Sequence, residues 1–453
     1  MHKHQKLDTA LRTIRQDLAD ILKAQAIDQA CRQSGHRWRD RVLTPVVVIH
    51  WFLRQILLGN TAVQHVSLLA GRAFTDSAYC QARSRIPLEA FRILLRNLNS
   101  AMQPQTRTDG LWHGHRTFLV DGSAVSMPDT PELQSHFGQP GGQKAGCGFP
   151  VAKILAMFNA GTGLLMELAI APLRTHEMSQ VGLIHPTLQP GDVLVGDRGF
   201  CSVVHLALLA QRNVHAVFRL HQRQLVDFAP GRPFAGPKDS GPQAKGKVRS
   251  RQIRKLGPLD QVVEWYRPAS LPKWLGTEKL AAVPDCVMVR ELQYAIGKRG
   301  YRTQQITLVT TLLDAEAYPA ESLAELYGIR WRVEQNLRDL KQTLGMDILK
   351  CKSVDGVLKE IHAFAIVHNL VRVVMSEAAK RQGVRPDRIS FADALRWLES
   401  ADFDMDLPRL VVNPERFGRA EPRVRKRRPK QFPVMKKPRA KWKQDLLTQQ
   451  LVA

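Results

Sequence analysis

The interpretation of this chain starts from residues 327–341, which read YGIRWRVEQNLRDLK. The stretch contains no proline, has no glycine after Gly328 and is rich in helix-forming residues, so we expect one continuous helix. With about 3.6 residues per turn, Tyr327, Arg330, Glu334 and Lys341 fall within one polar stripe about 60° wide. Leucines and a valine of the same stretch form an apolar face directly beside that stripe.

Glu334 thus stands among two cations and a phenol at the edge of an apolar face, which suits a metal ion next to bound phosphates. A plain surface helix is the alternative interpretation. Glu334 would then form ion pairs with Arg330 and Arg338, four residues away on either side, and such pairs contribute little to stability. The helix alone does not separate the two interpretations, so the rest of the chain has to decide.

The composition indicates a large basic globular protein. The chain has 453 residues, enough for two to four domains, and 66 Lys and Arg against 41 Asp and Glu give a formal net charge of +25. Hydrophobic residues make up 44% of the chain, so it should fold around proper cores. We expect a polyanion such as nucleic acid as the partner, because released counterions drive such binding. A ribosome-like or merely basic protein is the alternative.

Cysteine usage and the N-terminus place the protein inside the cell. The six cysteines are scattered, with no CxxC pair and no Cys/His spacing typical of zinc sites, which indicates a reducing compartment. The first residues lack the apolar segment of a signal peptide. The most apolar run, Val46–Leu58, is too short to span a bilayer. We expect a soluble cytoplasmic protein, associated with the nucleoid and with no membrane partner.

Residues 1–110 have the pattern of a helical N-terminal domain. We expect helices over Leu7–Leu22, over Pro45–Leu58, over Ala78–Ile86 with Asp76 or Ser77 as the cap, and over Leu88–Leu98. Arginines at positions 37, 39, 41, 83 and 85 make this block basic. A DNA-binding domain fits these observations, and so does a helical packing domain.

Short apolar runs separated by turns predict a mixed α/β core over residues 111–221 and 301–350. The expected strands are Thr117–Asp121, Val151–Asn159, Leu164–Ala171, Asp192–Asp197, Val214–Leu220 and Gln305–Thr311. The expected helices are His176–His185 and Val203–Arg212, in addition to the stretch quoted above.

The segments that flank or interrupt this core have different textures. Residues 222–300 contain a loop rich in Gly, Pro and Lys, followed by three short strand patterns (Gln261–Tyr266, Cys286–Glu291 and Gln293–Ile296) that predict a β insertion. Residues 351–410 predict a helical C-terminal region with a long helix over Val357–Arg381 and a short one over Phe391–Leu398.

Residues 411–453 form a basic arm. Between Pro414 and Lys443 there are thirteen Lys or Arg and two Glu, with Phe432 and Trp442 interleaved and five prolines that discourage helix. We expect an extended arm that lies on phosphates. A disordered solvated tail is the alternative.

Three acids stand at positions where α/β sheets place functional groups. Asp121 and Asp197 each end a predicted strand, and Glu334 lies on the predicted helix. Each acid borders apolar residues and is therefore costly unless a cation neutralises it. Three carboxylates with few neutral donors favour Mg²⁺ or Mn²⁺, and two such ions would hold the attacking and leaving oxygens of a phosphodiester in line.

These motifs resemble those of the DDE transposases of bacterial insertion sequences. The resemblance rests on Asp121-Gly-Ser, on Asp197-Arg-Gly-Phe and on the spacing Tyr327-x2-Arg330-x3-Glu334-x6-Lys341, which is similar to the Y-R-E-K signature of insertion-sequence family four. It extends to the order of elements over most of residues 75–380. It implies a ribonuclease-H-like catalytic core with a β-strand insertion, flanked by helical N-terminal and C-terminal regions.

The resemblance also implies roles for single residues. Asp121, Asp197 and Glu334 would be the catalytic residues and would hold two Mg²⁺ ions, with Mn²⁺ able to substitute. Tyr327, Arg330 and Lys341 would contact phosphates at the transposon end, near a base flipped out of a DNA hairpin. An aromatic residue of the insertion, Trp265, Tyr266 or Trp274, could stack on that base.

Further residues near these motifs are predicted to contact DNA. They are Trp331, Arg338, Arg198 and, in the glycine-rich loop of residues 138–148, Lys144. That loop lacks the Lys-Ser/Thr ending of a nucleotide-binding loop, and we expect it to cover the active site. Asp129 and Asp192 are interpreted as turn residues rather than metal ligands, and His362 and His368 as packing residues.

The implied reaction is cut-and-paste transposition. Water hydrolyses one strand at the element's end, the freed 3′-OH attacks the opposite strand to form a hairpin, a second water opens the hairpin, and the 3′-OH attacks target DNA. The implied partners are the double-stranded terminal inverted repeats, target DNA and a second copy of the chain in a homodimer. Two alternatives stay open: a catalytically inactive DNA-binding protein derived from a transposase, and a plain metal-dependent nuclease.

Overall fold

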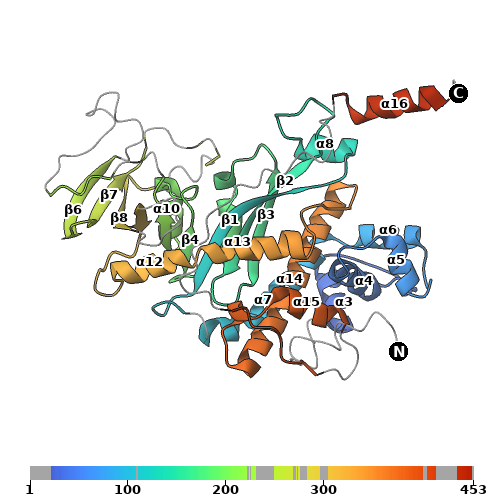
Figure 1. Cartoon of the computed structure of the whole chain (residues 1–453), viewed down its shortest axis with the longest axis horizontal. Coiled ribbons are helices and arrows are strands. Elements are labelled where there is room, and N and C mark those ends of the chain that lie inside the picture. The colour runs from blue at the N-terminus through green and yellow to red at the C-terminus, as the bar shows by residue number, and fades with distance from the viewer. Residues whose placement is uncertain are drawn as a thin grey trace.

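A computed structural model describes residues 22–108, 111–221, 224, 226–230, 249–268, 272, 274–275, 283–295, 305–400, 406–414 and 436–450. Helices α3 to α6 gather at one end of the molecule, and a large mixed sheet occupies the middle and the opposite end (Figure 1). The chain is therefore a mixed α/β protein with a helical N-terminal part. Among the described helices, no stretch has the length and apolar character needed to cross a bilayer.

Nine strands form one hydrogen-bonded sheet in the order β3-β2-β1-β4-β5-β9-β8-β7-β6. Strands β1, β4 and β5 run parallel to one another, whereas β2, β3 and β9 join them in antiparallel fashion. Their bounds are β1 Thr117–Ser126, β2 Val151–Asn159, β3 Leu165–Pro172, β4 Val193–Gly196, β5 His215–Arg219, β6 Ser250–Gly257, β7 Asp260–Tyr266, β8 Cys286–Ala295 and β9 Gln305–Thr310.

The prediction that the first strand ends at Asp121, before Gly122, is wrong. Strand β1 continues to Ser126 because β2 pairs with it over its whole length, from Phe118↔Asn159 to Ser126↔Val151. A Cβ atom at Gly122 would lie 2.5 Å from Cδ of Glu177, so the glycine makes room for that carboxylate instead of ending the strand. Asp121 consequently lies in the middle of β1, but just beyond the end of its parallel pairing with β4.

The strands of residues 222–300 extend the central sheet, since β8 pairs with β9 and thereby continues it outward through β7 to β6. The two predicted strands over residues 286–296 are a single strand, β8, and β6 was not predicted at all. Its charged residues Arg251, Arg254 and Lys255 interrupt any apolar alternation and hide the strand pattern in the sequence.

The N-terminal helices follow the sequence pattern closely. Helix α4 begins at Pro45 with Thr44 as its cap, as the Thr-Pro pair indicates. Helix α6 begins at Asp76 and is capped by Thr75, not by Asp76 or Ser77 as predicted. The bounds are α3 Ala24–Gln33, α4 Pro45–Leu57, α5 Val63–Leu69, α6 Asp76–Arg85 and α7 Leu88–Thr108. The predicted helix over Leu7–Leu22 lies outside the described residues, apart from its last residue.

The stretch predicted as one helix is divided into segments. Helix α12 (Ala320–Gly328) ends before Arg330, helix α13 (Trp331–Arg338) begins directly after it, and a π-helical turn covers Asp339–Thr343. Bonds of the i→i−3 type, from the Arg330 N–H to the Tyr327 carbonyl and from the Val333 N–H to the Arg330 carbonyl, bridge the first break. The chain therefore keeps its helical course through Arg330, with one tighter turn of 3-10 type at that position.

Other helices connect the strands and close the fold. The predicted helix His176–His185 is instead a series of short turns: a 3-10 turn (Glu177–Ser179), α9 (Val181–Ile184) and a second 3-10 turn (His185–Thr187). The remaining bounds are α8 Pro131–Phe137, α10 Val203–Ala210, α14 Val354–Gln382, α15 Phe391–Ser400 and α16 Arg439–Gln450.

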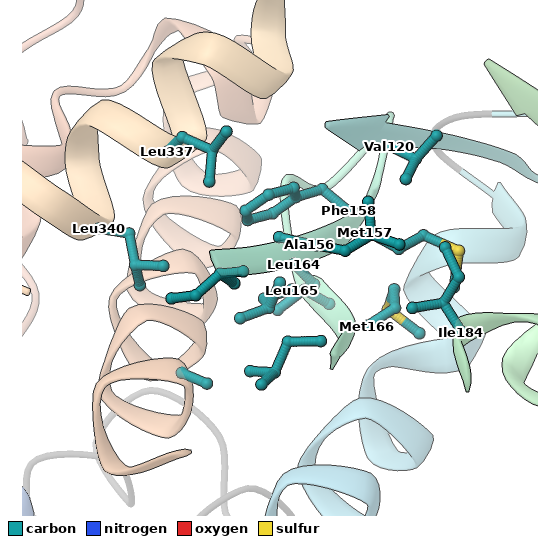
Figure 2. Packing of buried hydrophobic residues seen from close by; sticks show 14 of the residues in the cluster. Val120, Ala156, Met157, Phe158, Leu164, Leu165, Met166, Ile184, Leu337 and Leu340 are labelled. Atoms are coloured by element: carbon teal, nitrogen blue, oxygen red, sulfur yellow. The ribbon is translucent and has the colours of Figure 1, made fainter. Parts of the chain in front are cut away.

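The core joins the sheet to α13 and α14. Figure 2 shows Leu337 and Leu340 pointing from the α13 region toward Phe158 and Leu164 of the β2–β3 hairpin. On α14, His362 and His368 are buried, and burial lowers their pKa values to about 4 and about 3, so both stay neutral packing residues at physiological pH. This packing fixes α13 against the sheet and thereby fixes Glu334 relative to β1.

The C-terminal arm is only partly as predicted. From Arg439 onward it is helical (α16), and this helix projects away from the body (Figure 1). Arg439 anchors it through an ion pair with Asp129 (3.0 Å) and by stacking on Phe149. Residues 415–435, which hold most of the arm's charge, lie outside the described residues.

Candidate active site

Three polar residues lie in one row at the carboxyl edge of the parallel strands. The register aligns Val120 of β1 with Gly196 of β4, and Gly196 with Phe218 of β5. The residues that follow these positions are Asp121, Asp197 and Arg219. Parallel strands that end together place their next residues side by side, so the sheet brings together two acids that are 76 positions apart in the sequence.

Arg330 joins the third acid to this row. Its Nη2 lies 3.0 Å from Oε1 of Glu334, and its Nη1 lies 3.7 Å from Oδ2 of Asp121. The Arg330 side chain is 10% exposed, that of Asp121 25% and that of Glu334 42%, so the cluster opens to solvent on the Glu334 side. One guanidinium thus holds together a strand residue and a helix residue more than 200 positions apart.

The electrostatics of Asp121 indicate a shared acidic site. Burial raises the pKa of Asp121 to about 6, although the Gly122 N–H (2.8 Å) and Arg330 both lower it. The charges of Asp197 and Glu334 raise the same pKa further, so both acids lie close enough to act on Asp121. Asp197 points its Oδ1 back to the Arg198 N–H at 2.6 Å.

Tyr327 and Arg330 form a cationic and aromatic border to the acids. Burial raises the pKa of Tyr327 to about 12, with Asp197 raising it and Arg330 and Arg219 lowering it, so its hydroxyl remains protonated. Burial by itself would lower the pKa of Arg330, but Tyr327, Glu334 and both aspartates outweigh it and the pKa lies above its usual value. Arg330 therefore stays charged, and its Nε is buried without a hydrogen-bond acceptor in the part of the chain that the structure describes.

The donor chemistry fits a hard divalent cation. Within the part of the chain that the structure describes, no three His, Cys, Asp or Glu side chains are arranged closely enough to hold a metal ion. Arg330 lies between Asp121 and Glu334 and supplies the positive charge that these acids require. All three side chains offer carboxylate oxygens, the ligands that hard divalent cations prefer, and Asp121 is largely buried beside the other two acids. Asp121, Asp197 and Glu334 are the residues that could hold Mg²⁺ or Mn²⁺.

The other residues predicted to contact DNA lie at varied places. Trp331 and Arg338 are exposed on α13, Arg198 is exposed next to Asp197, and Lys341 is half-buried in the π-helical turn. Lys144 is exposed on a loop that Gln139 ties together through bonds to the backbone at residues 143, 144, 146 and 148. The described hydrogen bonds of this loop run to α8, where Gln134 donates to the Gly148 carbonyl, and to α16, where the Arg439 N–H reaches the Gly146 carbonyl, and not to the three acids.

Two aspartates and one tryptophan have structural roles. Asp192 is buried and forms a two-pronged ion pair with Arg116, at 2.8 and 2.6 Å. Asp129 binds Gln134 and Arg439. Trp265 is buried in β7 and donates its indole N–H to Glu291, so its ring is not available to a flipped base, whereas Tyr266 and Trp274 are only partly buried.

The sequence pattern missed Arg219. It ends β5 in line with Asp121 and Asp197, is half-buried, and lies close enough to Tyr327 and Tyr294 to lower the pKa of each. Among the described residues no carboxylate forms an ion pair with it. The sequence held a signal for Arg219, because a charged residue follows an apolar run at two strand ends. Arg219 follows Val-Phe at the end of β5, as Asp121 follows Leu-Val at the end of the parallel part of β1.

Comparison with known proteins shows the family of the chain. Residues 112–370 match the family described as the transposase DDE domain, and the chain belongs to that family. It is a transposase, an enzyme that cuts and joins DNA. The match contains Asp121, Asp197 and the whole stretch from Tyr327 to Lys341.

One relative is similar to the chain over nearly its whole length. The chain is 25% identical over 487 aligned positions to the transposase InsG for insertion sequence element IS4 from Escherichia coli (strain K12), with 96% of this chain and 99% of that protein covered. A solved synaptic complex of the piggyBac transposase with hairpin DNA is 9% identical and covers 86% of this chain and 78% of its own, with a TM-score of 0.42.

Proposed function

We propose that this transposase moves its element by a cut-and-paste reaction at a ribonuclease-H-like site, in which Asp121, Asp197 and Glu334 hold two Mg²⁺ ions. Mn²⁺ substitutes for Mg²⁺, since both ions prefer carboxylate oxygens. The observation that carries the proposal is the Arg330 bridge, which joins Asp121 to Glu334 beside Asp197. Acids that raise the pKa of a buried carboxylate beside them are typical of metal-dependent phosphoryl transfer.

The strand order supports the ribonuclease-H-like description of the core. Strands β3-β2-β1 are antiparallel, β1-β4-β5 are parallel, and both aspartates follow the parallel ladder. The insertion enters between β5 and β9, and Glu334 returns to the acids on α13. We propose the same domain limits as the sequence pattern indicates, with β6 to β8 extending the core sheet.

The residues around the acids divide the work of the reaction. When bound, the two ions activate the attacking oxygen and neutralise the charge that develops on the leaving oxygen. Arg330 and Arg219 hold the scissile phosphate from two sides, and Tyr327 donates its protonated hydroxyl to a phosphate oxygen. Lys341, Arg338, Arg198, Trp331 and Lys144 bind the flanking strand. Four successive in-line transfers, to water, to the opposite strand, to water and to target DNA, use the same arrangement.

The partners follow from this chemistry. The substrates are the double-stranded terminal repeats of the element and the target DNA, and two copies of the chain hold two ends together as a homodimer. Tyr266 or Trp274 stacks on the base that leaves the hairpin stem. The protein works in the cytoplasm, at the nucleoid.

The test measures cleavage of a labelled duplex from the end of the element by purified protein, with Mg²⁺ or with EDTA. Asp121→Asn, Asp197→Asn and Glu334→Gln should each abolish nicking and hairpin formation, whereas Glu325→Gln, an exposed acid on α12, should keep both. Nicking without hairpin formation or joining by the unmodified protein would instead indicate a plain nuclease. Metal-independent binding without any cleavage would indicate an inactive DNA-binding protein.

A further inference from the structure

Helix α13 carries a second polar stripe on the side opposite Glu334. With about 100° between successive residues, Arg332, Asn336 and Asp339 lie about 160°, 200° and 140° from Glu334 around the helix axis. These side chains do not project freely into solvent, since Asn336 is buried and the other two are half-buried. Burying polar groups costs free energy unless they are paired, so the back of the helix that carries the third acid must find partners elsewhere in the fold.

Arg372 of α14 is the main partner of this stripe. Its Nη2 donates to Oδ1 of Asn336 at 2.6 Å and lies 3.0 Å from Oδ2 of Asp339, so one guanidinium joins α14 to α13 and to the π-helical turn. The guanidinium also lies 5.2 Å from the ring centroid of Phe391 on α15. A Cβ atom at Gly163, in the turn between β2 and β3, would lie only 3.1 Å from its Cζ. Arg372 is therefore wedged between α13, α15 and the β2–β3 turn.

Arg332 fastens the same side of α13 in the opposite direction. Its Nη1 donates to the Ala160 carbonyl at 3.2 Å, directly after β2. Its Nη2 lies 2.9 Å from Oδ2 of Asp387, in the 3-10 turn (Pro386–Arg388) between α14 and α15. One arginine that reaches out of the helix and one that reaches in thus hold the back of α13 to the β2–β3 hairpin and to the C-terminal helices.

Stability alone does not account for this arrangement. A buried ion pair loses the hydration of both charges, and an apolar pair of similar volume is often as stable. The Nε of Arg372 is buried with no hydrogen-bond acceptor among the residues that the structure describes, which adds to the cost. Apolar contacts such as those of Leu337 (Figure 2) hold α13 on the sheet but are not directional. A hydrogen bond depends on angle, so the bond between Arg372 and Asn336 fixes the rotation of the helix about its axis.

The rotation of α13 decides where the carboxylate of Glu334 lies. A side chain ends about 5.5 Å from the helix axis, so a rotation of about 20° moves it by roughly 2 Å. That displacement is as long as a Mg²⁺–oxygen bond, and Mg²⁺ tolerates little departure from its octahedral geometry. Asn336 stands two residues after Glu334, so a bond that holds Asn336 holds the acid at the same level of the helix.

We infer that Arg372 is a positioning residue of the reaction: through Asn336 it fixes the rotation of α13 and thereby the place of Glu334 beside Asp121. Asp339 neutralises the buried guanidinium and keeps it directed at Asn336. Arg372 acts only through α13, since it lies on the far side of this helix from Glu334. The inference rests on the proposed function, because it takes Glu334 as a metal ligand whose support lies outside the site.

Hydrogen–deuterium exchange in EDTA tests the hold on α13 without any activity. In Arg372→Gln, the amides of residues 331–343 should exchange about tenfold faster than in the unmodified protein, and those of α4 should not change. The matched control is Arg116→Gln, which breaks another buried arginine–carboxylate pair, with Asp192, at the opposite end of the parallel strands. It should leave residues 331–343 unchanged. Unchanged exchange of residues 331–343 in Arg372→Gln would overturn the inference.

The metal requirement then separates positioning from plain stability. Arg372→Gln should raise the Mn²⁺ concentration for half-maximal cleavage by about tenfold and leave KM for DNA within about twofold. Asn336→Leu removes the acceptor but keeps the buried pair of Arg372 with Asp339, so it should fold and show the same shift. Gln335→Leu, at an exposed position of α13, should change neither quantity. A lower Tm with an unchanged Mn²⁺ requirement, as expected for Arg116→Gln, would assign Arg372 a structural role only and overturn the inference.

The unmodified protein distinguishes failure of this inference from failure of the proposed function. Metal-dependent cleavage, together with an unchanged Mn²⁺ requirement in both Arg372→Gln and Asn336→Leu, would refute the positioning role and leave the proposed function intact. Absence of cleavage under any metal would refute the proposed function, and the exchange of residues 331–343 would then still decide whether Arg372 holds α13.

Discussion

Replacing Asp121 by Asn should stabilise the metal-free protein while abolishing its activity. In the folded chain, burial and the neighbouring acids raise the pKa of Asp121 from 3.8 to about 6. The folded protein therefore binds the proton more tightly than the unfolded chain, and an ionised Asp121 opposes folding at neutral pH. A shift of about two pKa units corresponds to about 3 kcal/mol, which is an upper value because the side chain is 25% exposed.

The sign of this effect depends on pH in a defined way. Below the ordinary pKa of 3.8, Asp121 is protonated in both states, and Asn gives no advantage. As the pH rises from about 4 to about 6, the unfolded chain loses its proton first, so the stability of the unmodified protein falls relative to that of the variant. Above about pH 6 the difference should be constant, and it should shrink when Mg²⁺ is added, because the metal neutralises Asp121 in the unmodified protein.

Urea unfolding of both proteins in EDTA, over a pH series, measures the difference directly. Asp192→Asn is the contrasting control, because it breaks the buried two-pronged pair with Arg116 and should destabilise by about 3 kcal/mol. An Asp121→Asn protein that is less stable than the unmodified one at pH 7 would refute the electrostatic reasoning, and with it the view that the acids form one strained cluster.

Three further predictions concern the cations. Arg330→Ala should lose cleavage but show a larger rise in Tm on adding Mn²⁺ than the unmodified protein, because Arg330 no longer competes with the metal for Asp121 and Glu334. A thermal-shift assay measures the rise, with Arg338→Ala as the control. An equal rise in Tm would contradict the competition between Arg330 and the metal. Arg219→Gln should lower the cleavage rate by about 10- to 100-fold and leave the rise in Tm with Mn²⁺ unchanged. The control is Arg212→Gln, at an exposed position, which should change neither quantity. A changed Tm response to Mn²⁺ would make Arg219 part of the metal site instead. Removing residues 415–453 should weaken DNA binding and flatten its salt dependence, measured by fluorescence anisotropy, and an unchanged slope would count against the arm as a phosphate contact.

The sequence predicted the elements of the site better than their arrangement. Asp121 and Asp197 could be found from the apolar runs that precede them, because a charged residue after a buried run stands out. That Asp121 lies inside a longer strand could not be read from the chain, since the extension depends on pairing with β2, about thirty residues away in sequence. Gly122 looked like a turn residue, but a glycine is required there because the Glu177 carboxylate occupies the space of a Cβ atom.

The same distinction explains the other differences. The break at Arg330 follows Gly328, and the contact of the Arg330 side chain with Asp121 of β1 is a tertiary contact that the local pattern could not predict. Arg219 becomes a site residue only when β4 and β5 are aligned. Local patterns thus predicted the helices α4, α7 and α14, which contain long apolar runs, whereas contacts across the sheet required the structure.

The most direct test of the central claim is excision of the element from a plasmid by the unmodified protein and by Glu334→Gln, each with Mg²⁺ and with EDTA. If Asp121, Asp197 and Glu334 form one metal-dependent site, only the unmodified protein with Mg²⁺ will release the element and join it to a target. Equal excision by Glu334→Gln would show that α13 is a surface helix and that the catalytic site lies elsewhere.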